Sequence, residues 1–353
     1  MRLKKLELRN FKKFINKETY NFQKSNRYDS DSDLTLIVGN NGTGKSSILQ
    51  AIVLVAATAS REGFKIEDFD WPGFEHRHMQ TGKLPCEINC TFEFQDEELD
   101  AIVEFAEKLI EKGIPLGVPS KVKDVKLKYD YQNSKVVASE GANAYYQFGG
   151  YQYAKRLAKF SVGKDRFFDK VGNIYWYTEQ RTSYSISKSL DVETPEIDWM
   201  RSFLSTAYSF HIAVSEGKRN LSEGEFDFYS KLHTLYKKVF PSRAFIGSAP
   251  NFDAFDKIKV PDFFLTDGNS QYEISEMSAG ERAIFPILLD FARWNINNSI
   301  IIIDEVELHL HPSLQQAFVR ALSKIGSSNQ FILTTHSETI VNMFEESNII
   351  RLK

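Results

Sequence analysis

The feature that most constrains this sequence is a glycine-rich segment between an apolar run and a helix-forming run. Leu34 to Val38 is a short apolar run typical of a buried strand, and Lys45 to about Ser60 predicts a helix. The segment between them matches the spacing G-x-x-x-x-G-K-[ST] and reads Gly39-Asn40-Asn41-Gly42-Thr43-Gly44-Lys45-Ser46-Ser47. A strand, such a loop and a helix in succession predict an α/β fold with a phosphate-binding loop.

This loop suits the phosphates of a nucleotide. Glycine lets the backbone turn tightly, so that N–H groups point at an anion, and the start of the following helix adds a favourable dipole. Lys45 is expected to reach the β- and γ-phosphates, and the Ser46 hydroxyl is expected to bind Mg²⁺. The alternative, a glycine-rich turn without a ligand, is disfavoured by the flanking strand and helix.

Two neighbouring carboxylates follow an apolar run nearer the C-terminus. Ser299 to Ile303 predicts a strand buried on both faces, and Asp304 and Glu305 come directly after it. Ligands of open parallel sheets bind at the carboxyl ends of the strands, so both acids are expected near the phosphate loop. Asp304 is the predicted Mg²⁺ ligand, and Glu305 is placed to polarise an attacking water.

Two further motifs flank this acidic strand. The segment Met277-Ser278-Ala279-Gly280-Glu281 predicts a helix start, with Ser278 as the N-cap and Glu281 completing a capping box. At the same time, the Ser278 hydroxyl and the glycine N–H groups have the chemistry to face a phosphate. Thr334-Thr335-His336-Ser337 follows another buried strand, where His336 is either a structural histidine or a hydrogen-bonding partner of a γ-phosphate.

Strands and helices alternate near both ends of the chain, which predicts a parallel sheet covered on both sides. Residues 1–15 predict a strand whose many basic side chains form either a solvated edge or a phosphate-facing surface. The other predicted elements are a strand around 88–94, a helix over 96–112, strands over 121–180, helices over 195–240, 278–295, 312–325 and 337–344, and strands over 330–334 and 348–352.

Composition excludes several classes of protein. The 353 residues carry a formal net charge of -3, so a basic protein that coats nucleic acid is excluded. Cys86 and Cys90 are about 13 Å apart on a strand, too far for a disulfide, and they read as reduced core thiols rather than a metal pair. The apolar run Ala51 to Ala59 is too short to span a bilayer, and the charged N-terminus is no signal peptide. A cytoplasmic location is expected.

The order of these motifs resembles that of an ABC-type ATPase head of the SMC, RecF and OLD branch. The opening Asn10-Phe11-Lys12-Lys13-Phe14 is similar to the N-x-aromatic-basic start of that branch. The run Asp304-Glu305-Val306-Glu307-Leu308-His309-Leu310-His311-Pro312 resembles the DEPExHLHP stretch of short bacterial ATPases of the AAA type found in phage-defence systems. Val306 departs from the proline usual there, which alters the turn and removes no chemistry.

The resemblance implies a P-loop NTPase that binds ATP and Mg²⁺ as a homodimer. Residues 1–60 and 265–353 would form the ATPase core, with a mixed or parallel sheet, and 61–264 an α+β insertion lobe. Each phosphate loop would face the other chain's signature, formed by Ser278, Ala279, Gly280 and Glu281.

The same resemblance gives roles to single residues. Glu305 would be the general base and His336 the γ-phosphate sensor, while Lys12 and Lys13 would touch the nucleotide. Gln180 is the candidate for the glutamine that links Mg²⁺ to the lobe, the alternative being a plain glutamine at a strand end. His309 and His311 would pack in the dimer interface, although a metal pair is conceivable.

Features that the sequence lacks argue against three kinds of related ATPase. The signature comes over 230 residues after the phosphate loop, a longer interval than in transporter subunits, and the chain lacks the long heptads of SMC proteins. An OLD-type enzyme would continue past His336 into a nuclease domain, so effector activity is expected from another chain, such as a nuclease.

Three functions remain. The leading hypothesis is an ATP-hydrolysing switch that dimerises on ATP and controls a separate effector in anti-phage defence. A RecF-like repair ATPase would bind DNA through a basic groove formed by the N-terminal lysines together with Lys121, Lys123, Lys126 and Lys128, unless the latter four only solvate a sheet edge. A scaffold that binds ATP and turns it over slowly is the third.

Overall fold

The computed structural model describes residues 1–22, 33–61, 63–80, 84–160, 167–179, 197–221, 225–251 and 260–353. Its strands are β1 (Arg2–Arg9), β2 (Glu18–Asn21), β3 (Asp33–Val38), β4 (Glu87–Glu93), β5 (Asp124–Asp130), β6 (Lys135–Ala138), β7 (Ile174–Tyr177), β8 (Ala244–Ala249), β9 (Asp262–Thr266), β10 (Gln271–Glu273), β11 (Ile300–Ile303), β12 (Gln330–Thr335) and β13 (Ile349–Arg351). Its α-helices are α1 (Lys45–Ser60), α2 (Asp96–Glu111), α3 (Ala142–Tyr146), α4 (Gly150–Ala158), α5 (Phe167–Lys170), α6 (Ile197–Ser215), α7 (Phe228–Val239), α8 (Ala279–Trp294), α9 (Pro312–Leu322) and α10 (Glu338–Val341).

A parallel sheet lies at the centre of the molecule. Its strand order is β13-β3-β12-β11-β7, and every neighbouring pair is parallel. All four isoleucines of β11 are buried, as expected for a strand covered on both faces. The prediction of a parallel sheet is confirmed, and the sheet brings the carboxyl ends of β3, β11 and β12 to one edge.

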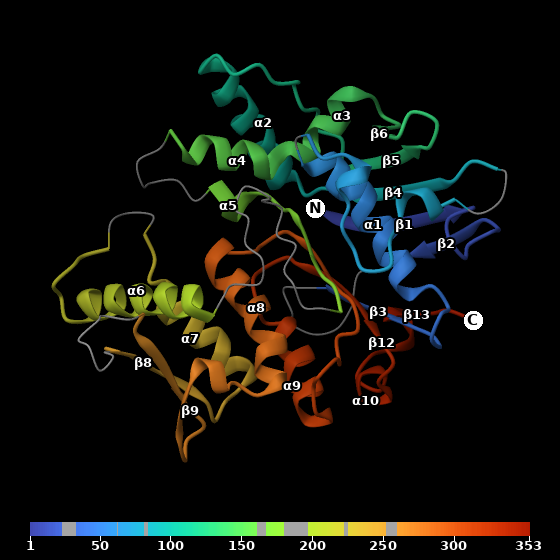
Figure 1. The fold of residues 1–353 in the computed structure, drawn as a ribbon. Coiled ribbons are helices and arrows are strands. Elements are labelled where there is room, and N and C mark those ends of the chain that lie inside the picture. The colour runs from blue at the N-terminus through green and yellow to red at the C-terminus, as the bar shows by residue number, and fades with distance from the viewer. Residues whose placement is uncertain are drawn as a thin grey trace.

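A second sheet lies above the parallel sheet in Figure 1 and is antiparallel, in the order β2-β1-β4-β5-β6. Helix α1 packs between the two sheets, and 13 of its 16 residues are buried. An all-round apolar surface is what such a position requires. The phosphate loop at the start of α1 is therefore anchored to the most deeply buried helix of the fold.

Alternate residues of the parallel strands belong to different cores. Ile37, Ile302 and Ile332 pack in one core with the apolar side chains of α1. Leu36, Ile303 and Leu333 pack in the other, with the side chains of α8 and α9. Because side chains of a strand alternate between faces, α1 and α8 cover opposite faces of the sheet.

The structure corrects several sequence expectations. The strand predicted over 1–15 ends at Arg9, and residues 11–14 form a turn closed by hydrogen bonds between Phe11 and Phe14. Strands were expected over 121–180, yet 142–158 is helical, since Tyr151, Ala154 and Leu157 lie on one buried face. The aromatic content of that segment favours strands only as a local preference, and packing against neighbouring elements overrides it.

Strands from the middle of the sequence complete both large sheets. Strand β4 pairs with β1 in the antiparallel sheet, and β7 pairs with β11 in the parallel one. The division at residues 60 and 265 remains a prediction of domain boundaries. Across the described parts of the chain, no helix is both long enough and apolar enough to cross a bilayer.

Candidate active site

The phosphate loop connects β3 to α1 and depends on two glycines with left-handed backbone. Gly42 has φ 77° and Gly44 has φ 103°, values that side chains other than glycine rarely adopt. A Cβ atom on Gly44 would also lie 2.9 Å from Cζ of Phe14, too close for any methyl group. Only glycine therefore permits both the turn and the packing of Phe14 against it.

Lys45 is held against the loop that precedes it. Its side chain is buried, and Nζ donates to the carbonyl oxygens of Gly39 at 3.0 Å and Asn40 at 3.2 Å. Burial lowers the pKa of Lys45, while the carboxylates of Asp304 and Glu305 oppose that shift. The ammonium is thus placed inside the loop and within the electrostatic influence of the acidic strand end.

The turn at residues 11–14 covers the outside of the phosphate loop. Lys13 Nζ donates to the carbonyl oxygen of Gly42. Lys12 takes a different direction, because its Nζ donates to Oε1 of Gln50 at 2.5 Å and to the Gly73 carbonyl at 3.1 Å. Of the two predicted lysines, Lys13 contacts the loop and Lys12 contacts helix α1.

Thr334 links the Asp304 carboxylate to the backbone of Glu305, the two residues that follow β11. Its hydroxyl donates to Oδ1 of Asp304 at 2.5 Å and accepts the backbone N–H of Glu305 at 2.7 Å. Glu305 has φ 47°, an uncommon conformation for a residue with a side chain and one that clusters at functional sites. The last residues of β12 therefore fix the backbone that carries the predicted base.

The surroundings of Glu305 suit a general base. Burial raises its pKa, and the negative charges of Asp304, Glu307 and Glu179 raise it further, while His336 opposes them. A base with a raised pKa accepts a proton more readily than an ordinary glutamate. The electrostatic coupling to His336 places both predicted catalytic groups in one neighbourhood.

Glu307 holds the histidine motif, a role that the sequence analysis did not assign. Its carboxylate accepts the Thr335 hydroxyl at 2.7 Å and the backbone N–H of His336 at 2.5 Å. The next residue, Ser337, donates its hydroxyl to Oε1 of Gln315 at 2.6 Å. The third acidic residue after β11 was the available signal, and its partners became visible only with the fold.

A cavity of about 260 Å³ lies beside the phosphate loop. Gly39 and Asn40 of the loop line it together with Thr335 and His336. His336 is exposed, so its imidazole is accessible to a ligand in this cavity. The fold thus brings the loop and the histidine motif together from opposite ends of the sequence.

The signature residues lie elsewhere in the same chain. Ser278 caps α8 and forms the predicted capping box with Glu281, which is confirmed in both directions. Because α8 and α1 cover opposite faces of the sheet, Ser278, Ala279 and Gly280 do not line the cavity beside the phosphate loop.

Glu281 is buried among donors that the motif alone does not reveal. Tyr236 and Tyr272 donate their hydroxyls to Oε1 at 2.5 and 2.6 Å, and Arg243 forms an ion pair with Oε2. Burial alone would raise the pKa of Glu281, but these partners outweigh it and lower the pKa to about 2. The start of α8 is therefore fixed to α7 and β10 through a charged residue.

The predicted metal ligands have the oxygen chemistry that Mg²⁺ prefers. Ser46 offers a hydroxyl and Asp304 a carboxylate, whereas Gln180 lies outside the described residues. Within the described ranges, no group of three or more His, Cys, Asp or Glu side chains could hold a metal.

The two cysteines and the two histidines after β11 were also singled out in the sequence. Cys86 and Cys90 are free, buried thiols, as expected. His311 Nδ1 lies 3.0 Å from the Ser313 hydroxyl, and His309 has φ 62°. These positions leave the predicted interface role of the histidines untested.

The lysines of the predicted basic groove are paired with acids. Lys121 and Lys123 form ion pairs with Asp100 and Asp96 of α2. Lys126 pairs with Glu7 of β1 on the open face of the antiparallel sheet. Three of the four lysines are thus matched by carboxylates.

Comparisons with known proteins agree with this geometry. A family model described as AAA ATPase domain matches residues 1–341. The Retron Vc95 probable ATPase of Vibrio cholerae serotype O1 biovar El Tor is 24% identical over 98% of this chain and 76% of that protein. The Retron Ec83 probable ATPase of Escherichia coli is 31% identical over 35% of this chain, which corresponds to 24% of that protein.

A solved structure shares the fold. The crystal structure of an SMC head bound to the C-winged helix domain of ScpA matches with a TM-score of 0.53 and 17% identity. The match covers 99% of this chain and 94% of that one. The α/β fold with a P-loop NTPase core, expected from the motifs, is confirmed.

Proposed function

The chain belongs to the AAA ATPase domain family, and we propose that it is a switch that dimerises on ATP and controls a separate effector protein. The ATPase itself follows from the family. The observation that carries the rest of the proposal is the placement of the signature and the phosphate loop on opposite faces of one sheet. Each chain then holds two half-sites, and two chains complete both.

The chain's own residues suggest how hydrolysis proceeds. The loop N–H groups and Lys45 bind the phosphates, and Ser46 with Asp304 would hold Mg²⁺, which neutralises charge on the phosphates when bound. Glu305 accepts the proton of the attacking water. Glu307 holds the backbone of His336, so that its imidazole faces the γ-phosphate from the cavity beside the loop.

Mixing two inactive variants tests the shared site. Lys45→Ala removes the phosphate-loop cation, and Ser278→Arg blocks the signature. A dimer of one chain of each kind contains one intact composite site, because its loop comes from the Ser278→Arg chain and its signature from the other. At a 1:1 ratio we expect about a quarter of wild-type ATP hydrolysis, since half of the dimers are mixed.

The control is a mixture of Lys45→Ala with Glu305→Gln. Both residues belong to the phosphate-loop half of a site, so each composite site of a mixed dimer carries one of the two changes and no site is intact. Circular dichroism checks that Ser278→Arg folds, because the loss of an N-cap costs about 1 kcal/mol. Activity of the first mixture no higher than that of its components would contradict a site built across two chains.

The similarity to two retron probable ATPases supports the proposal of an effector in anti-phage defence. We expect cells that carry this gene with its genomic neighbours to resist phages, and Lys45→Ala to abolish that resistance. The measurement is the efficiency of plating on a phage panel. The matched control is Lys155→Ala, a helix-surface lysine of α4. Equal plating with and without functional Lys45 would refute an ATP-driven defence role.

The DNA-repair alternative receives no specific support, because the lysines proposed for its groove pair with Asp100, Asp96 and Glu7. A slow-turnover scaffold is disfavoured by the raised pKa of Glu305. The first proposal therefore stands alone.

A further inference from the structure

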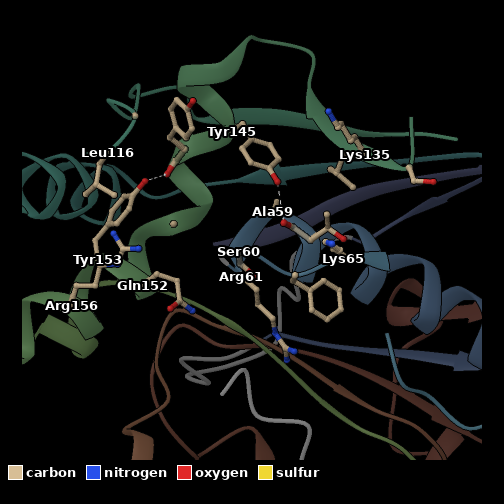
Figure 2. Close-up of a pocket in the computed structure, with 18 of the residues that line it drawn as sticks. Ala59, Ser60, Arg61, Lys65, Leu116, Lys135, Tyr145, Gln152, Tyr153 and Arg156 are labelled. Carbon is tan, nitrogen blue, oxygen red and sulfur yellow. Dashed lines mark hydrogen bonds between the residues drawn. The ribbon is translucent and has the colours of Figure 1, made fainter. Parts of the chain in front are cut away.

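A second cavity lies at the far end of the helix that starts at the phosphate loop. It has a volume of about 700 Å³ and is lined by residues from the end of α1, by Arg61, Phe64 and Lys65, by the start of β6 and by helices α3 and α4 (Figure 2). This volume is within the range of small-molecule sites, about 300–1,000 Å³. No part of the phosphate-loop site contributes to its lining.

The charged side chains that line this cavity, which we call the α1-end pocket, are mostly basic. Arg61, Lys65, Lys135 and Arg156 line it, and Glu67 is the single acidic residue among its described lining residues. Figure 2 shows Arg156 on one side of the pocket and Lys65 and Lys135 on the opposite side, with Arg61 below. An anion in the pocket would therefore have cations on several sides.

Aromatic rings provide the second element of the α1-end pocket. Tyr145 donates its hydroxyl to the Thr58 carbonyl at 3.0 Å, and Tyr153 donates to the Tyr146 carbonyl at 3.0 Å (Figure 2). Both hydroxyls are thereby occupied, which orients the rings before any ligand arrives. When a planar group stacks on such a ring, little free energy is lost in ordering the tyrosine side chain.

Two glycines allow the rings of Tyr153 and Tyr146 to pack closely against the backbone. A Cβ atom on Gly149 would lie 2.6 Å from Cζ of Tyr153, and one on Gly117 would lie 2.0 Å from Cε2 of Tyr146. Backbone with a side chain could not approach the rings so closely. The aromatic wall of the pocket is thus a rigid part of the fold.

A buried polar atom supports a ligand role. Ser60 is 3% exposed and lines the pocket, and its hydroxyl oxygen finds no hydrogen-bond partner among the described residues. Buried hydroxyls are almost always satisfied, so an exception inside a cavity points to a partner that arrives from outside. A polar ligand would supply that partner.

The guanidinium of Arg61 forms part of the pocket floor. It lies 4.3 Å from the ring centre of Trp176 in β7 and 5.1 Å from that of Phe64. These cation–π contacts hold the arginine in one place and tie the pocket to the parallel sheet. The positive charge nearest the centre of the fold is therefore fixed in position.

We propose that the α1-end pocket binds a nucleoside phosphate, either as a free nucleotide or as the end of a nucleic-acid strand. The phosphate would be held by Arg156, Lys65 and Lys135, and the base would stack on a tyrosine ring. Cations together with fixed aromatic rings are the combination that binds this chemistry. The site is distinct from the ATP site, because helix α1 separates the two by its length of about 24 Å.

Calorimetric titration tests this binding in the Lys45→Ala background, where the phosphate loop lacks its cation. The probes are the four nucleoside 5′-monophosphates, a 5′-phosphorylated tetradeoxynucleotide and inorganic phosphate. We expect at least one nucleoside monophosphate or the tetranucleotide to bind at least tenfold more tightly than inorganic phosphate. Preference for the monophosphate identifies a free nucleotide as the source, and preference for the tetranucleotide identifies a strand end.

Variants locate the binding in the pocket. Arg156→Ala and Lys65→Ala should each weaken the best probe by at least tenfold. Lys155→Ala removes the same charge from α4 one residue away, outside the lining, and should change affinity less than twofold. Circular dichroism verifies the fold of each variant.

Three results would overturn the proposal. These are no binding of any nucleotide probe up to 1 mM, an affinity for inorganic phosphate equal to that for the best probe, or unchanged affinity in both Arg156→Ala and Lys65→Ala. Because the readout is binding and not hydrolysis, the outcome is independent of whether the chain acts as an effector switch.

Discussion

Replacing Glu305 with glutamine is expected to lower ATP hydrolysis by about 10²- to 10⁴-fold, the usual contribution of a positioned general base. Glutamine keeps the size of the side chain but cannot accept the proton of the attacking water. The backbone at this position should be retained, because the Glu305 N–H still donates to Thr334. ATP binding should therefore persist, and the ATP-bound dimer should accumulate.

Two measurements check this expectation. Phosphate release under saturating ATP gives the rate, and light scattering after size-exclusion chromatography gives the mass of the ATP-bound species. Glu111→Gln, an exposed carboxylate at the end of α2, is the matched control and should change neither value. A Glu305→Gln protein with near-normal turnover would assign the base to another residue.

Replacing Glu281 with glutamine should lower the free energy of unfolding by about 3 kcal/mol, the cost of breaking a buried charged pair. The carboxylate is 2% exposed and accepts hydroxyls from Tyr236 and Tyr272 beside its ion pair with Arg243. The neutral amide of glutamine leaves the Arg243 guanidinium without its counter-charge. It also places an N–H group against partners that themselves donate.

This contribution should depend on pH. The pKa of Glu281 is lowered from an ordinary 4.5 to about 2, so its stabilisation is complete above about pH 5 and is lost as the pH falls toward 2. Between pH 7 and pH 4, the stability difference between wild type and variant should shrink by about 1 kcal/mol.

Urea unfolding at the two pH values measures both effects. Glu276→Gln is the matched control, since Glu276 also completes a capping box but is exposed, in the 3₁₀ turn Ile274–Glu276 just before α8. Glu276→Gln should lower the free energy of unfolding by less than about 1 kcal/mol at either pH. An equally small effect of Glu281→Gln would show that the buried network contributes no net stability.

The sequence predicted those parts of the site that depend on local order. The strand before the phosphate loop, the helix after it and the capping box at Ser278 are all short-range patterns, and all three are confirmed. The carboxylates after β11 were also located correctly, because a run of four isoleucines has few alternatives to a buried strand.

What the sequence could not predict depends on contacts between distant segments. Thr334 bridges Asp304 and Glu305, and Glu307 holds His336, only because β11 and β12 are adjacent in register. The three partners of Glu281 that lie outside the capping box come from α7, β10 and residue 243, and no local pattern indicates that they meet. The helices over 142–158 were missed for the same reason, since packing and not propensity decides them.

The position of β3 in the parallel sheet has a consequence for how the protein is made. Both neighbours of β3, the strands β12 and β13, come from the end of the sequence. Strand β3 ends at Val38 and β12 begins at Gln330, an interval of about 290 residues. At about 5–20 residues per second, the ribosome needs roughly 15–60 s to deliver these partners. Throughout that time β3 lacks both of its sheet neighbours, so a nascent chain that stalls before β12 carries a phosphate loop without a folded site.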